Sequence, residues 1–122
     1  MSAGDKLDRK RRSERKGRRA ELLAALALML KGYRIVTLRY RTPVGEIDIV
    51  ARKGDLIAFV EVKARRDLAS GVDAVSYPAQ RRIAAAGELF ISRQRDGPRL
   101  SWRHDIMVVS PWRWPKHLED AF

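Results

Sequence analysis

The sequence contains no cysteine and only two histidines, His104 and His117, in 122 residues. Without cysteine, disulfide frameworks, thiolate metal sites and cysteine nucleophiles are all excluded. Two histidines are also too few for a histidine-rich zinc site. The lack of disulfides is compatible with a reducing compartment, and we expect the protein to be cytoplasmic.

Long hydrophobic segments are lacking as well. The longest uninterrupted apolar run covers residues 22–30, whereas a membrane-spanning helix needs about 20 residues. Basic residues precede the run, as in a signal peptide, but Lys31-Gly32-Tyr33 follows where a cleavage site would need small residues. We therefore interpret the run as a helix of the folded domain and expect no membrane partner. A peripheral membrane helix is the weaker alternative.

Acidic residues are few compared with basic ones. The chain has 26 Lys and Arg against 15 Asp and Glu, which gives a formal net charge of +11. Such a charge favours a polyanionic partner, with nucleic acid ahead of an acidic membrane. Residues 1–19 carry a net charge of +6, more than half of the excess. We therefore predict a disordered basic leader at residues 1–16.

The remaining chain has enough apolar residues for one folded domain. Hydrophobic residues make up 45% of the sequence, and two independent cores would each be too small. Hydrophobic periodicity and turn residues predict a single α/β domain at residues 17–110, of order α-β-β-β-α-β, with a mixed sheet flanked by helices. The predicted elements are helices at 17–31 and 78–93 and strands at 33–40, 46–51, 56–64 and 100–109. We expect residues 111–122 to form an irregular tail that packs back through Trp112 and Trp114.

Two of the predicted strands combine apolar runs with charged side chains. Residues 45–50 and 59–63 are apolar enough to be covered on both faces of a sheet. Charged residues are rarely buried without partners, so this conflict is a first indication of a functional site. The charged residues in these strands are Glu46, Asp48, Glu61 and Lys63.

The turn between these strands determines which charged residues meet. A two-residue turn at Gly54-Asp55, with glycine first as type II′ turns prefer, places Asp48 opposite Glu61 and Glu46 opposite Lys63. All four side chains then lie on one face, because side chains alternate along a strand. A three-residue loop would instead put Asp48 and Glu61 on opposite faces.

Directly opposed carboxylates would repel each other by roughly 3 kcal/mol at an effective dielectric of ~20. A divalent cation between Asp48 and Glu61 would remove this repulsion, and Mg²⁺ or Mn²⁺ accepts such oxygen ligands. Lys63 could stabilise a phosphate or orient a metal-bound water at the same point. This composition is typical of phosphodiester hydrolysis. The alternative is a cross-strand salt-bridge network on a solvated face, which the apolar neighbours Ile49 and Val60 disfavour.

The motifs Gly45-Glu46-Ile47-Asp48, Val60-Glu61-Val62-Lys63 and Arg103-His104-Asp105 together resemble the YraN-type family. These small bacterial proteins are related to the PD-(D/E)XK, or restriction-endonuclease-like, nucleases and to archaeal Holliday-junction resolvases. The resemblance covers residues 17–109, and the predicted element order agrees with that nuclease core.

The resemblance implies a role for each matching residue. Asp48 and Glu61 would be acidic metal ligands, the Val62 carbonyl a third ligand and Lys63 the catalytic lysine. Glu21 in the first helix matches an additional acidic residue near the metal. The equally weighted alternative for Glu21 is a solvent-exposed helical carboxylate that pairs with Arg18 or with other neighbours on the helix.

Other positions match the family less closely. Gln80 lies where the second helix carries a polar residue in many of these nucleases. Ile47 replaces the proline of the PD signature, Ala79 stands where a lysine is expected, and His104 where an aromatic residue is expected. These last two departures affect contacts of the second helix and the last strand. We interpret His104 as a packed residue and Asp105 as a partner for an arginine.

Several residues outside the predicted metal site are candidates for contacts with nucleic acid, whereas the tryptophans are not. The candidates for phosphate contacts are Arg65, Arg66, Arg81 and Arg82, and Gln80 is a further candidate for contact with nucleic acid. Trp102, Trp112 and Trp114 are interpreted as packing residues, because they do not alternate regularly with basic residues.

These observations predict a metal-dependent endonuclease that acts on DNA, on branched or single-stranded structures rather than a specific sequence. The alternative is an accessory protein that binds nucleic acid with the nuclease fold but without turnover. A homodimer is expected only by analogy with junction-cutting nucleases.

Overall fold

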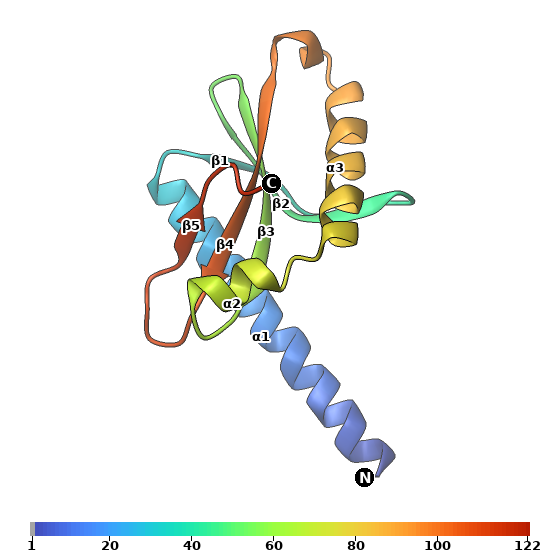
Figure 1. Cartoon of the computed structure of the whole chain (residues 1–122), viewed down its shortest axis with the longest axis vertical. Helices are drawn as coiled ribbons and strands as arrows, with labels where there is room; N and C mark the ends of the chain where they lie inside the picture. The colour runs from blue at the N-terminus through green and yellow to red at the C-terminus, as the bar shows by residue number, and fades with distance from the viewer. Residues whose placement is uncertain (1) are drawn as a thin grey trace.

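A five-stranded mixed sheet forms the centre of the structure, which is a computed structural model describing residues 2–122 (Figure 1). The strands lie side by side in chain order, and only β3 and β4 run parallel; the other neighbouring pairs are antiparallel. Their bounds are β1 Arg34–Thr42, β2 Gly45–Lys53, β3 Leu56–Ala64, β4 Ser101–Val109 and β5 Lys116–Leu118. The predicted strand at 56–64 therefore has the bounds of β3.

Helices cover both faces of the sheet. The long helix α1 packs on one face, where alanines and Leu28 meet apolar residues of β2 and β3. Helices α2 and α3 cover the other face, where Phe59 and Phe90 lie in a second apolar cluster. The helical bounds are α1 Ala3–Leu30, α2 Leu68–Asp73, α3 Tyr77–Ser92 and a 3-10 turn η1 at Gly97–Arg99. The predicted α/β class is confirmed; the order gains α2 and β5.

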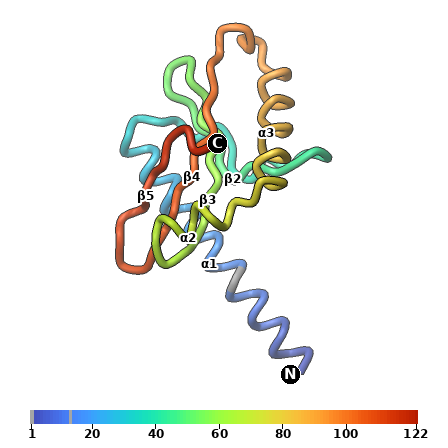
Figure 2. Tube along the Cα trace, viewed as in Figure 1, coloured from blue at the N-terminus to red at the C-terminus, as the bar shows by residue number. Residues whose placement is uncertain are grey.

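The first helix begins much earlier than predicted. A capping box holds its start: the Ser2 hydroxyl accepts the Asp5 N–H, and the Asp5 carboxylate accepts the Ser2 N–H. The part of the chain that we expected to be a disordered leader is thus helical from Ala3 on, and Figure 2 shows it projecting away from the sheet. The division into leader, domain and tail stays a prediction.

The turn between β2 and β3 has the predicted form. Gly54 has φ +61°, and of the two turn residues only this glycine has a positive φ, as a type II′ turn requires. The strands pair from Lys53↔Leu56 to Ile49↔Val60. The predicted register is confirmed over these residues, and the ladder ends one pair before Asp48 and Glu61.

Beyond this point the β1–β2 hairpin leaves β3 and lies against α3 (Figure 1). A Cβ at Gly45 would overlap the backbone carbonyl of Arg82 in α3, so only glycine allows the hairpin to approach so closely. Tyr40 contacts Phe90 edge-on, with ring centroids 5.4 Å apart. Packing on α3 therefore bends the hairpin away from the sheet.

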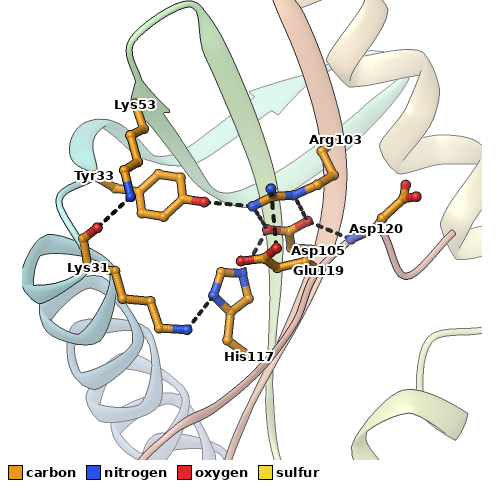
Figure 3. Close-up of polar contacts among 8 residues, drawn as sticks. All are labelled: Lys31, Tyr33, Lys53, Arg103, Asp105, His117, Glu119 and Asp120. Carbon is orange, nitrogen blue, oxygen red and sulfur yellow. Dashed lines mark hydrogen bonds and ion pairs between the residues drawn. The ribbon is translucent and has the colours of Figure 1, made fainter.

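The C-terminal tail is more ordered than predicted. Asp105, whose side chain is fully buried, accepts hydrogen bonds from Arg103, from His117 Nε2 at 2.7 Å and from the Asp120 N–H at 3.0 Å (Figure 3). Burial raises the pKa of Asp105, but the bonds from His117 and Arg103 outweigh it and bring the pKa to about 2. This cluster attaches β5 to β4 and confirms that Asp105 pairs with an arginine.

The end of the chain packs through residues other than those predicted. The Phe122 ring stacks on His104 with centroids 5.1 Å apart, and burial lowers the pKa of His104. His104 is therefore a packed residue, as interpreted from the sequence. By contrast, Trp112 and Trp114 are exposed, so the prediction that the tail packs through them is wrong.

Candidate active site

The separation of β2 from β3 places Asp48 in its position. Once the ladder ends at Ile49↔Val60, the Asp48 Oδ2 atom accepts the backbone N–H of Val62 at 2.8 Å. This bond satisfies a strand N–H on the side of β2 and holds the carboxyl group of Asp48 beside Glu61. The predicted meeting of Asp48 and Glu61 therefore occurs, through side chains and not through a continuous ladder.

Glu61 is largely buried, with 13% of its side chain exposed. Burial first, and then the hydrogen bond and like charge of Asp48, raise the pKa of Glu61 to about 9. Glu61 therefore keeps its proton at neutral pH and can share it with Asp48. Paired carboxyl groups of this kind release the proton when a cation binds between them.

Lys63 lies two residues after Glu61 on the same strand face. Its Nζ atom is 3.7 Å from Glu61 Oε1. The charge of Lys63 acts to lower the pKa of Glu61, but burial and Asp48 outweigh it. A cationic nitrogen thus stands next to the carboxyl pair, where it can meet a phosphate.

The donor set of this site fits a small, hard cation. One carboxylate oxygen of Asp48 accepts the N–H of Val62. The other oxygen of Asp48 and the Glu61 carboxyl group remain available as metal ligands. Mg²⁺ is commonly held by one or two carboxylates, with water and substrate phosphates as further ligands. Within residues 2–122, no group of three or more acidic or histidine side chains could hold a metal ion by itself. The site therefore fits a two-carboxylate arrangement, and the role of the Val62 carbonyl stays a prediction.

Glu46 does not reach Lys63 as predicted. It pairs across the β1–β2 hairpin with Arg41, and the Arg41 Nε to Glu46 Oε1 distance is 3.2 Å. The reason is the bend of the hairpin, which carries this end of β2 away from β3. The predicted register is therefore wrong at this pair.

Glu21 and Arg39 form an ion pair next to the carboxyl groups. The Arg39 Nε atom is 3.0 Å from Glu21 Oε2, and the Glu21 side chain is 17% exposed. The hydrogen bond and charge of Glu21, and more weakly the charge of Asp48, raise the pKa of Arg39. Glu21 thus lies near the site but is half-buried and paired with Arg39, and not exposed beside Arg18 as the alternative expected; its role as an additional acidic residue stays a prediction.

Arg39 was missed by the sequence interpretation. Its φ of +55° is unusual for a residue other than glycine and marks an irregular point in β1. The pairs Leu38↔Ile49 and Tyr40↔Ile47 flank it, so Arg39 lies opposite Asp48 on the neighbouring strand. Counting back across the Thr42–Gly45 turn would have revealed this position.

The predicted phosphate-contacting residues fall into two places. Arg65 and Arg66 are exposed directly after β3, within three residues of Lys63. Arg81 and Arg82 are exposed on α3 and line a separate hollow with Val44. Their contacts with nucleic acid stay predictions. Gln80, the remaining candidate, donates its side-chain N–H to the Val75 carbonyl at 3.2 Å and so helps to fix the start of α3.

Comparison with known proteins gives the family of the chain. The model of the uncharacterised protein family UPF0102 matches residues 20–109, which include the carboxylate pair and Lys63. A UPF0102 protein of Sinorhizobium medicae is 60% identical over the whole of both chains. One of Chelativorans sp. is 56% identical over all of this chain and 98% of the relative, and one of Mesorhizobium japonicum is 55% identical over 93% and 90%. Among the described residues, no helix is long and apolar enough to cross a bilayer. The chain belongs to the UPF0102 family.

Proposed function

We propose that this protein is a divalent-metal-dependent endonuclease that hydrolyses phosphodiester bonds in DNA. The observation that carries the proposal is the Asp48–Glu61 carboxyl pair with Lys63 at 3.7 Å, set in a chain of net charge +11. A largely buried acidic pair beside a lysine has no evident use in a protein that only contacts phosphates. The resemblance to the PD-(D/E)XK nucleases supports the same conclusion.

Each residue of the site has a chemical task in this proposal. Asp48 and Glu61 would hold Mg²⁺ or Mn²⁺, and Glu61 would give up its proton as the ion binds. The bound ion supplies Lewis acidity and makes water a better nucleophile at neutral pH. Lys63 faces the scissile phosphate and stabilises the negative charge that develops on its oxygens. The exposed pair Arg65 and Arg66 contacts neighbouring phosphates.

The test is cleavage of branched, single-stranded and duplex DNA in the presence of Mg²⁺ or Mn²⁺. Asp48→Asn keeps an oxygen for the Val62 N–H but removes the charge, so it should lower the cleavage rate by roughly 10²-fold or more, as should Lys63→Ala. Asp73→Asn, at an exposed carboxylate of α2, is the matched control and should cleave normally. Unchanged cleavage in both site variants would contradict the proposal.

A second candidate is a nucleic-acid-binding protein without turnover. It is favoured by the pairing of Glu21 with Arg39, which leaves the two carboxyl groups of Asp48 and Glu61 at the candidate active site. This alternative expects salt-dependent DNA binding, no cleavage with either metal and no effect of Asp48→Asn on binding. Cleavage that is lost in Asp48→Asn would exclude it.

A further inference from the structure

A groove lies beside α1 at the end of the sheet where the parallel strands β3 and β4 both finish. Its apolar lining includes Ala20 and Leu23 of α1 together with Ala64 and Val109 at the strand ends. Trp112 and Trp114, from the loop between β4 and β5, line it as well. The candidate active site uses none of these side chains.

Both tryptophans of this loop are open to solvent. Trp112 is fully exposed and has φ +59°, and Trp114 is 56% exposed. Two large aromatic rings left in water cost stability, since burying such a ring is worth a few kcal/mol. A positive φ at a bulky residue adds strain to the same loop. Exposed rings in a strained loop therefore point to a ligand that covers them.

The charges around the groove indicate what that ligand is. Lys16, Arg19 and Arg113 line the same groove, and all three are exposed. A second copy of this chain would bring further positive charge to the same place, which disfavours self-association there. A polyanion with flat apolar faces satisfies both the cations and the tryptophans. Single-stranded DNA has these properties, because its bases can stack on aromatic rings while its phosphates contact basic side chains.

The groove and the candidate active site are lined by residues that are neighbours along the chain. Ala64 lines the groove and directly follows Lys63, while Ala20 lines it and directly precedes Glu21. Successive strand residues point to opposite faces, so DNA that leaves the groove must pass around the end of β3 to reach Lys63.

We infer that this groove binds single-stranded DNA, with bases stacked on Trp112 and Trp114 and phosphates held by Lys16, Arg19 and Arg113. The binding itself requires no metal and no catalysis. The further idea that the bound DNA reaches Asp48, Glu61 and Lys63 rests on the proposed function. Duplex DNA, whose bases are already stacked on each other, does not gain these contacts.

The experiment uses the full chain and a short oligodeoxythymidine in EDTA, so that no cleavage occurs. Tryptophan fluorescence should be quenched on titration, and the affinity is measured in parallel by fluorescence anisotropy of labelled DNA. Trp112→Ala and Trp114→Ala should each weaken binding by about tenfold, as expected when a stacking contact of 1–3 kcal/mol is lost. Trp102→Ala is the matched control, because Trp102 is also exposed, at 45%, but lies on β4 outside the groove. It should bind normally.

Several outcomes would overturn the inference. These are unchanged affinity in the Trp112→Ala and Trp114→Ala variants with normal circular dichroism, or equal affinity for duplex DNA of the same length. Self-association that is lost in Trp112→Ala would show that a second copy covers the groove, and equal quenching by anionic lipid vesicles would show a membrane contact. Asp48→Asn separates the two proposals: it should abolish cleavage and keep the quenching. If the protein never cleaves but still binds through the two tryptophans, the proposed function fails and this inference stands.

Discussion

The protonation of Glu61 depends on a balance between burial and two neighbouring residues. Burial and the adjacent carboxyl group of Asp48 favour the neutral form, and Lys63 at 3.7 Å favours the charged form. The neutral form prevails up to about pH 9. A cation bound by the pair would reverse this balance, because it replaces a proton by a charge that stabilises both carboxylates. Stability and metal binding are therefore linked through one side chain.

This linkage predicts how stability depends on pH. The pKa of Glu61 is about 9 in the folded chain, against 4.5 for the free side chain. Between these values the folded state binds one more proton than the unfolded state, so the free energy of unfolding in EDTA should fall as pH rises, by an amount on the order of a few kcal/mol. Urea unfolding at pH 5, 7 and 9 measures this fall.

Glu61→Gln provides the comparison, because glutamine keeps the shape of the protonated group and cannot ionise. Its stability should change less between pH 5 and pH 9 than that of the unmodified chain. Mg²⁺ should stabilise the unmodified chain most at high pH, where Glu61 loses its proton. A variant with the same pH slope as the unmodified chain would show that Glu61 is not the group responsible.

Arg39 and Glu21 allow a second prediction at this scale. Removing Arg39 takes a positive charge away from Asp48 and frees the Glu21 carboxylate, so Mn²⁺ affinity should rise threefold or more, an order-of-magnitude expectation for nearby charges. Asparagine is the suitable replacement, since it tolerates positive φ. Calorimetric titration with Mn²⁺ measures the change in Arg39→Asn.

The matched control is Arg41→Asn, which breaks the more exposed pair with Glu46 and should change the affinity less. The double variant Arg39→Asn, Glu21→Gln should lose most of the gain, because the freed carboxylate is gone. Lower Mn²⁺ affinity in Arg39→Asn would mean that Arg39 supports the site rather than competing with the ion.

At the scale of elements, local sequence signals were sufficient for most of the sheet. The Gly54-Asp55 turn and the alternating side chains predicted both β3 and the register that brings Asp48 towards Glu61. The bend of the β1–β2 hairpin could not be predicted, because it depends on packing between Gly45 and Arg82, which are far apart in the sequence. Because of that bend, Glu46 pairs with Arg41 and does not face Lys63, and Asp48 accepts the backbone N–H of Val62.

The structure of the two ends of the chain was not predicted correctly. The first turns of α1 are charged and exposed, so they carry no apolar periodicity, and only the Ser2–Asp5 capping box marks their start. In the tail, hydrophobicity pointed to Trp112, whereas the buried contact is the polar bond between His117 and Asp105. Both errors come from treating hydrophobic pattern as the main source of order.

The glycine of the Gly45-Glu46-Ile47-Asp48 motif is predicted to act through packing. Gly45→Ala places a methyl group against the Arg82 carbonyl and should destabilise the protein by about 1–3 kcal/mol. Gly17→Ala is the control: nothing lies within 4 Å of its added Cβ, so it should stabilise α1 by up to about 1 kcal/mol. Thermal unfolding of the two variants compares them. Equal stability would show that the hairpin can move away from α3 at no cost.

At the scale of the whole molecule, a net charge of +11 contrasts with the small acidic pair of Asp48 and Glu61. The first half of α1 carries much of the excess charge and projects from the sheet (Figures 1 and 2). Lys16 and Arg19 of the same helix line the groove together with Trp112 and Trp114. A helix with this charge can hold the phosphates of a strand whose bases occupy the groove. It thereby extends the contact beyond the folded core.

Salt dependence distinguishes this role of the helix from a general effect of net charge. Replacing Arg11 and Arg12 by glutamine keeps helix propensity and removes two exposed charges. If both contact phosphates, the slope of log affinity against log salt for single-stranded DNA should become shallower by about 1.4. Replacing Arg95 and Arg99, exposed in the turn after α3 and in η1, removes the same charge. Equal slopes for the two variants would show that the helix only adds to the net charge; a change confined to the Arg11 and Arg12 variant would place DNA along α1.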